Sequence, residues 1–182
     1  MRQRKLCNKV KSISVEVIRD NAHSIRDMLK NTRFDMPKLP IASILDHLRD
    51  SGQIEFVIVE DKELPHEYAV STPRDRTIIV RESVYHNAIN GIPRDCFTLA
   101  HELGHLLLHT DTNPTYARSQ TPSNHHFTED AEWQANTFAS ELLVDCRLTS
   151  GMKNPREIAE VFGVSMEAAG YVYERYKKSG VL

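Results

Sequence analysis

The stretch Phe97-Thr98-Leu99-Ala100-His101-Glu102-Leu103-Gly104-His105 decides the fold, because it places a His-Glu-x-x-His pattern inside a segment with helical periodicity. Residues four apart lie on one face of a helix, so His101 and His105 are close enough to bind one metal ion. Glu102 then projects beside the same ion, where its carboxylate can act on a bound water. Neutral imidazoles with one open coordination position are typical of zinc. The stretch therefore predicts a zinc helix with Glu102 as the catalytic group.

Residues 128–143 predict a second helix that supplies a third ligand. Thr128 is the expected N-cap, and Glu132 and Asn136 share one helical face. Glu132 is the carboxylate that we expect at the metal, with Asn136 accepting a hydrogen bond from the ring of a ligating histidine. The alternative is that Glu132 is a solvated acid on an amphipathic helix.

His109 follows His105 by four residues and extends the row of histidines. A helix rotates by about forty degrees over four residues, so a third imidazole does not easily reach the same ion. His109 is therefore expected behind the ligands, or as a cation at the end of the helix.

The two segments together resemble the ImmA/IrrE family of zinc metallopeptidases. The resemblance rests on the Phe-Thr-x-Ala-His-Glu-x-Gly-His run and on the later Glu-x-x-Ala-Asn-x-Phe-Ala-x-x-Leu-Leu run, and it covers roughly residues 40–178. It implies that His101, His105 and Glu132 are metal ligands and that Glu102 is the catalytic acid and base. In one departure, Val144-Asp145 stands where family members usually carry Met-Pro, which affects the end of the helix more than the site.

The resemblance also implies a substrate class. Family members cleave or inactivate a helix-turn-helix repressor and so derepress genes of mobile elements or stress responses. The corresponding expectation is a Zn²⁺-dependent endopeptidase whose partner is such a repressor. The alternative is a regulator or toxin-like protein that keeps the zinc fold and acts by binding protein or DNA, with little proteolysis.

Length and composition are those of one well-cored domain with a modest appendage: 182 residues, 40% hydrophobic and 26% charged. A net charge of −2 argues against DNA binding, although residues 1–11 carry five cations and no acid. That run is expected to be a solvated tail, with docking to nucleic acid as the alternative.

No apolar stretch is long enough to span a membrane. Cys7, Cys96 and Cys146 are widely spaced, which favours reduced thiols in the cytoplasm.

The expected fold class is α+β, a zincin-like metallopeptidase domain. Residues 1–39 form a basic arm and a helix, residues 40–150 the zinc core, and residues 151–182 a helical pair packed on the core. Segments 54–59, 68–71 and 77–80 are predicted to form a small antiparallel sheet.

The C-terminal pair has a helix-turn-helix outline. Asn154 and Ser165 are the expected N-caps, and Gly163 ends the first helix. A packing role is favoured over DNA recognition.

The connection over residues 110–127 is long for a structureless loop. It is either a lid beside the metal or a surface loop. If it is a lid, then Tyr116, His125 or His126 is a candidate for stabilising the oxyanion of a tetrahedral intermediate.

Overall fold

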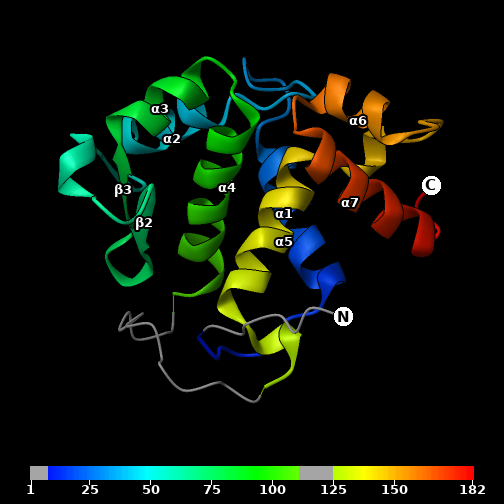
Figure 1. The fold of residues 1–182 in the computed structure, drawn as a ribbon, viewed down its shortest axis with the longest axis horizontal. Helices are drawn as coiled ribbons and strands as arrows, with labels where there is room; N and C mark the ends of the chain where they lie inside the picture. Colours follow the sequence, from blue (N-terminus) through cyan, green and yellow to red (C-terminus); the bar gives the residue numbers. More distant parts are fainter. Residues whose placement is uncertain (1–7, 111–124) are drawn as a thin grey trace.

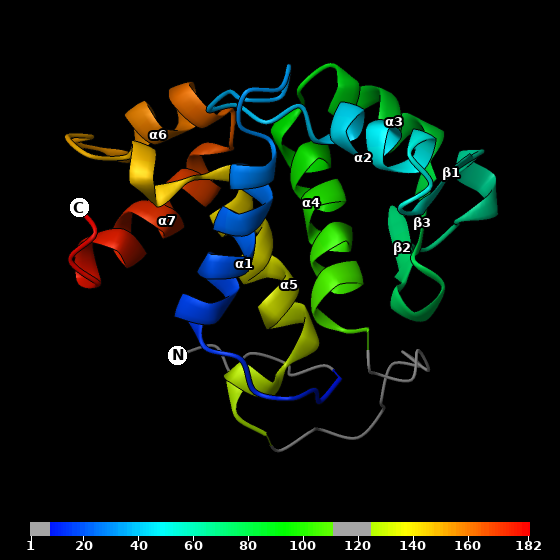
Figure 2. The ribbon, with the colours of Figure 1, turned by 180° about the vertical axis from the view of Figure 1, so that it is seen from behind.

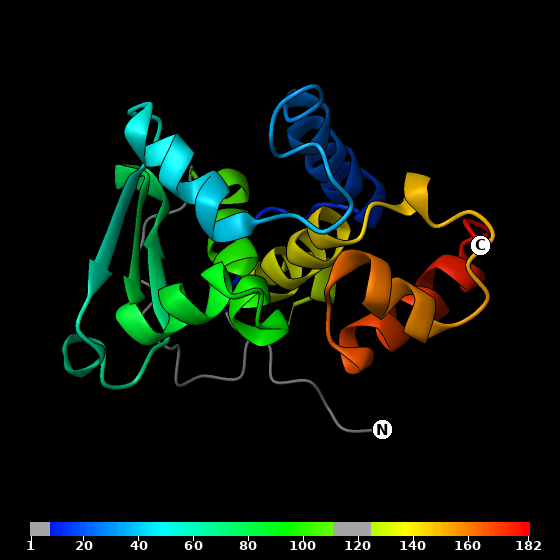
Figure 3. The same ribbon diagram turned by 90° about the horizontal axis from the view of Figure 1, so that it is seen from above.

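The computed structural model describes residues 8–110 and 125–182. A small sheet lies at one end, two central helices follow, and the last two helices of the chain close the other end (Figures 1 and 3). The helices are α1 (Val15–Met28), α2 (Ile41–Asp50), α3 (Glu82–Ile89), α4 (Pro93–Leu108), α5 (Ala131–Leu143), α6 (Pro155–Phe162) and α7 (Met166–Lys178). The strands are β1 (Glu55–Val59), β2 (Ala69–Thr72) and β3 (Thr77–Arg81).

The sheet is mixed, so the prediction of an antiparallel sheet is wrong for one of its two strand pairs. β3 lies in the centre, antiparallel to β2 and parallel to β1. The turn at Pro73–Asp75 fixes only the β2–β3 hairpin. The longer connection over residues 60–68 takes the chain away from β1 before β2 begins. β3, and not β2, therefore pairs with β1. Short strand patterns do not reveal strand order, and the parallel pair was missed for this reason.

One face of the sheet is buried against helices. Ile78 and Val80 of β3 are fully buried, whereas the alternate residues of this strand are only half-buried. Phe56 of β1 and Ala69 of β2 join the same hydrophobic cluster. α4 contacts both β2 and β3, so the sheet is fixed against the zinc helix of the sequence prediction.

α4 and α5 pack unusually closely at Gly104. A Cβ atom at this position would lie 3.0 Å from the Phe138 ring and 3.2 Å from the backbone of Ala135. Glycine is therefore needed for the approach of the two helices. α1 packs against α5 (Figure 2), so α5 has helices on more than one side.

α5 begins later than predicted. Thr128 lies in the 3₁₀ turn Phe127–Glu129, and the N-cap is Asp130, whose Oδ1 accepts a 2.8 Å hydrogen bond from the Trp133 amide. The prediction of Thr128 as the cap is therefore wrong, because the chain before α5 is shaped by a neighbour from the N-terminus.

That neighbour is the segment of residues 8–13. The Val10 amide donates to the Glu129 carbonyl at 2.8 Å, and the Ile13 amide donates to the Thr128 carbonyl at 3.1 Å. The main chain in the described part of the basic run is therefore hydrogen-bonded to the turn before α5, so this part is not a solvated tail. Arg2, Arg4 and Lys5 lie outside the described residues.

α6 and α7 begin and end as predicted. The side chains of Asn154 and Ser165 cap the two helices, and Gly163 takes a left-handed conformation (φ 67°) between them. The buried hydroxyl of Tyr176 in α7 lies 2.9 Å from Glu141 Oε2 and 2.8 Å from the Val144 carbonyl. These contacts hold α7 against the end of α5.

Within residues 8–110 and 125–182, we find no helix with the length and apolar character needed to cross a bilayer.

Candidate metal centre

The structure brings His101, His105 and Glu132 together between α4 and α5. The two Nε2 atoms are 3.0 Å apart, and each lies 3.3 Å from one carboxylate oxygen of Glu132. Glu132 thus faces the imidazoles and is not a solvated acid directed away from them. Among the described residues, these three form one of two groups whose donor atoms are close enough to share a metal ion.

The spacing fits a tetrahedral ion. Zinc binds nitrogen and oxygen donors at about 2.0–2.2 Å, which in a tetrahedron separates two donors by roughly 3.3–3.6 Å. The observed separations of 3.0 and 3.3 Å are close to that range.

The neighbours of His101 and His105 determine which ring nitrogen carries the proton. Asn136 Oδ1 lies 3.1 Å from His101 Nδ1, as the shared helical face predicted. The amide oxygen accepts, so the His101 proton is on Nδ1 and the lone pair is on Nε2.

Gln134 determines the His105 tautomer through His109. Gln134 Nε2 donates to the carbonyls of Lys11 (2.8 Å) and Thr128 (2.7 Å), so its Oε1 must accept from His109 Nε2 at 3.0 Å. His109 Nδ1 then accepts from His105 Nδ1, also at 3.0 Å. The His105 lone pair is therefore on Nε2, which faces Glu132.

With these tautomers, two imidazole lone pairs and a carboxylate converge at one point. Such a set of donors matches the ligands of a divalent cation. In the absence of a metal ion, an added proton on Nε2 lets these imidazoles donate to Glu132, and hydrogen bonds from His101 and His105 then hold the pKa of Glu132 far below its usual range. Burial lowers the pKa of His101, but the bond to Glu132 and the charge of Glu102 outweigh it, so the net direction is upward. A proton can therefore substitute for a metal ion here.

His109 supports the site and is not a cation. Its side chain is buried, and this burial, together with the nearby His105, lowers its pKa to about 4. The alternative of a positively charged group at the helix end is therefore wrong for His109.

Glu102 lies outside the group of three donors but next to it. Its Oε2 accepts a 2.6 Å hydrogen bond from the Ser71 hydroxyl of β2, and the carboxyl group is mostly buried. Ser71 thus positions Glu102 from the opposite side of α4. Sequence spacing does not reveal this contact, because it joins a strand residue to a helix residue 31 positions away.

Sequence comparison identifies the family. The model of the peptidase family M78, described as the IrrE N-terminal-like domain, matches residues 53–173. The chain belongs to this family. The match confirms the family resemblance of the two helical segments.

Comparison with solved structures finds a protein with a similar fold. A Mycobacterium tuberculosis transcriptional regulator has a similar structure, with a TM-score of 0.50 and 17% sequence identity. The match covers 84% of this chain but only 45% of that regulator. No curated protein matches the chain.

The structure describes two of the three candidates for oxyanion stabilisation. Tyr116 lies outside the described residues. His125 Nε2 lies 3.6 Å from Asp130 Oδ2, and its side chain is buried. His126 accepts from the Thr128 amide and so caps the 3₁₀ turn. The described contacts of His125 and His126 are thus with Asp130 and with the 3₁₀ turn that precedes α5.

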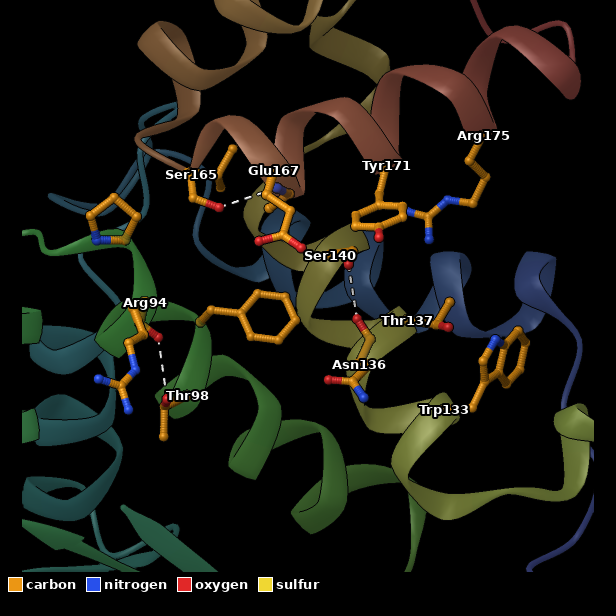
Figure 4. A pocket seen from close by; sticks show the side chains of 14 residues that line it. Arg94, Thr98, Trp133, Asn136, Thr137, Ser140, Ser165, Glu167, Tyr171 and Arg175 are labelled. Carbon is orange, nitrogen blue, oxygen red and sulfur yellow. Dashed lines mark hydrogen bonds between the residues drawn. The ribbon is translucent and has the colours of Figure 1, made fainter. Parts of the chain in front are cut away.

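A groove of about 730 Å³ adjoins the candidate metal centre (Figure 4). It runs between α4, α5 and α7 and includes Asn136, the partner of His101. Three aromatic side chains line it: Phe97, Trp133 and Tyr171. Tyr171 is strongly exposed. Sequence reasoning missed this groove because its walls come from three separate helices.

Proposed function

We propose that the protein is a zinc-dependent endopeptidase, with His101, His105 and Glu132 as metal ligands and Glu102 as the catalytic acid and base. The observation that carries the proposal is the convergence of three metal-binding donors with Glu102 held beside them. Membership of a peptidase family supports the reaction class.

The chain's own residues would divide the chemistry as follows. When bound, zinc supplies Lewis-acid polarisation and lowers the pKa of water. Oε2 of Glu102 already accepts the hydrogen bond from the Ser71 hydroxyl. We therefore assign Oε1 as the atom that takes the proton from the attacking water. The same carboxyl then gives the proton to the nitrogen of the leaving amine. Asn136 and His109 keep the imidazoles in the required tautomers throughout.

The outer edge of β2 is the surface that we assign to the substrate backbone. β2 is an edge strand that contacts α4. The Arg81 amide donates to the Tyr68 carbonyl, so the alternation of an antiparallel pair directs the backbone groups of Ala69 and Ser71 away from β3. An extended peptide added there would pass beside Glu102.

We further propose that the substrate is a helix-turn-helix repressor in the cytoplasm, as the family resemblance implies. The aromatic groove beside Asn136 offers space for the residues that flank the cleaved bond. We assign α6 and α7, whose outline resembles a helix-turn-helix, to packing rather than DNA recognition, since Tyr176 is directed into the core.

The test combines metal analysis with cleavage. Glu102→Gln should keep the metal of the wild type but lose cleavage by about a hundredfold to ten-thousandfold. His101→Ala, His105→Ala and Glu132→Ala should each lose the ion of this site. The substrate to test is any helix-turn-helix protein encoded by a gene adjacent to this one, with fragments detected by mass spectrometry.

Three results would count against the proposal. Unchanged metal content in all three ligand variants would remove these residues from the site. Equal cleavage rates for Glu102→Gln and the wild type would refute the mechanism. Repressor binding without fragments, even in zinc-loaded protein, would favour the regulator that acts by binding.

A further inference from the structure

A second group of metal-binding side chains lies at the opposite end of α5. His23 of α1 faces Asp145 and Cys146, which follow the last turn of α5. His23 Nε2 is 3.5 Å from Asp145 Oδ1 and 3.5 Å from Cys146 Sγ. We call these three residues the His23 cluster.

The His23 cluster is separate from the candidate active site. Glu132 lies in the first turn of α5, whereas the cluster lies beyond its last residue, Leu143. At 1.5 Å per residue, about 16 Å of helix separates Glu132 from Leu143. One ion cannot serve both groups.

The distance between His23 and Asp145 suits an ion better than a hydrogen bond. An N–H···O bond normally spans about 2.7–3.2 Å, so 3.5 Å between His23 and Asp145 is too long. Zinc distances of about 2.0–2.1 Å to nitrogen and 2.3 Å to sulfur place those donors roughly 3.5 Å apart in a tetrahedron. The observed nitrogen–sulfur distance is 3.5 Å.

The surroundings hold the carboxylate in place. Arg147 Nη2 donates to Asp145 Oδ2 at 2.7 Å, while Oδ1, the oxygen nearest His23, accepts the Arg147 amide and Nε at 2.9 Å each. An ion bound to Oδ1 would displace the hydrogen bond from Arg147 Nε to this oxygen. Arg147 Nε could then donate to Oδ2 alone, from which it lies 3.1 Å away. Arg147 would then orient the ligand from behind, as carboxylate partners do in known metal sites. Asp145 and a Cys146 thiolate together would balance the charge of a divalent ion.

We propose that His23, Asp145 and Cys146 form a second metal site, for a divalent transition ion that favours thiolate and imidazole donors, such as Zn²⁺ or Co²⁺. Binding displaces the thiol proton of Cys146 into solvent, and a water completes the coordination. The ion ties α1 to the segment after α5, across a sequence separation of 123 residues between His23 and Cys146. It therefore acts as a clip that stabilises the fold, independently of peptide hydrolysis.

Cobalt distinguishes the two sites, because only the His23 cluster supplies a thiolate. Metal-free full-length protein titrated with Co²⁺ should bind two ions and develop a near-ultraviolet band from thiolate-to-cobalt charge transfer. Cys146→Ser and His23→Ala should each lose one equivalent, and Cys146→Ser should also lose the band. His101→Ala should lose the other equivalent and keep the band.

Matched thiol variants provide the controls. Cys96→Ser and Cys7→Ser should keep both the band and two equivalents of metal. Thermal melts of the metal-free proteins check that Cys146→Ser folds. Added Zn²⁺ should raise its melting temperature less than that of the wild type.

Absence of the band in wild-type protein that binds cobalt would overturn the second site, as would an unchanged metal content in Cys146→Ser. Neither result bears on the ligands of the candidate active site, because the His101→Ala variant tests those separately.

Discussion

Replacing Gln134 by methionine should weaken metal binding without touching a ligand. The change removes the amide that donates to the carbonyls of Lys11 and Thr128 and accepts from His109. One unsatisfied buried group costs about 1–3 kcal/mol, so three groups, two of them only partly buried, should lower the free energy of unfolding by roughly 3–5 kcal/mol. His109 would also be free to move its proton to Nδ1. His105 would then carry its own proton on Nε2, where the metal should bind.

The expected loss of zinc affinity at this site is about tenfold to a hundredfold, as for other partners that orient metal ligands. Competition with a chelating dye measures the affinity, and urea unfolding of the metal-free protein measures the stability. Gln53→Met is the matched control, because Gln53 is exposed and should leave both unchanged. Wild-type zinc affinity in Gln134→Met would refute the argument that this amide determines the His105 tautomer.

Three further changes test the packing and the electrostatics. Gly104→Ala should cost about 1–3 kcal/mol in urea unfolding, because its Cβ meets the backbone of α5, whereas Gly170→Ala, with open space around it, should be neutral or slightly stabilising. Tyr176→Phe should lower the unfolding free energy by about 1–3 kcal/mol, while Tyr173→Phe, whose hydroxyl bond is exposed, should change it little. A pKa of about 4 keeps the folded His109 neutral while the unfolded imidazole takes up a proton below about 6.5. Metal-free protein should therefore lose about 3 kcal/mol as the pH falls from 6.5 to 4, and His109→Leu should not show this loss. Equal pH profiles of the two proteins would contradict the buried neutral histidine.

The parts of the site that sequence spacing could predict are local ones. His101 and His105 share a face because they are four residues apart, and the same rule places Glu132 beside Asn136. Ser71 could not be foreseen in the same way, because its contact with Glu102 depends on how β2 packs against α4.

The errors in the fold have the same origin. Thr128 and Asp130 are both good N-caps, and the docked residues 8–13 decide between them by shaping the preceding turn. Strand spacing predicted three strands, but the parallel pairing of β1 with β3 depends on where the 60–68 connection passes. Both outcomes are tertiary effects that override local propensity.

The hydrogen bond from Gln134 to the N-terminal segment ends on the main-chain carbonyl of Lys11. Every amino acid carries that carbonyl, so substitutions at position 11 leave the bond available as long as the chain keeps its course. We therefore expect the amino acid at position 11 to vary in evolution. Gln134 and His109 should vary little, because their contacts depend on their side chains. A segment whose sequence varies among relatives can in this way still help to hold a histidine in place.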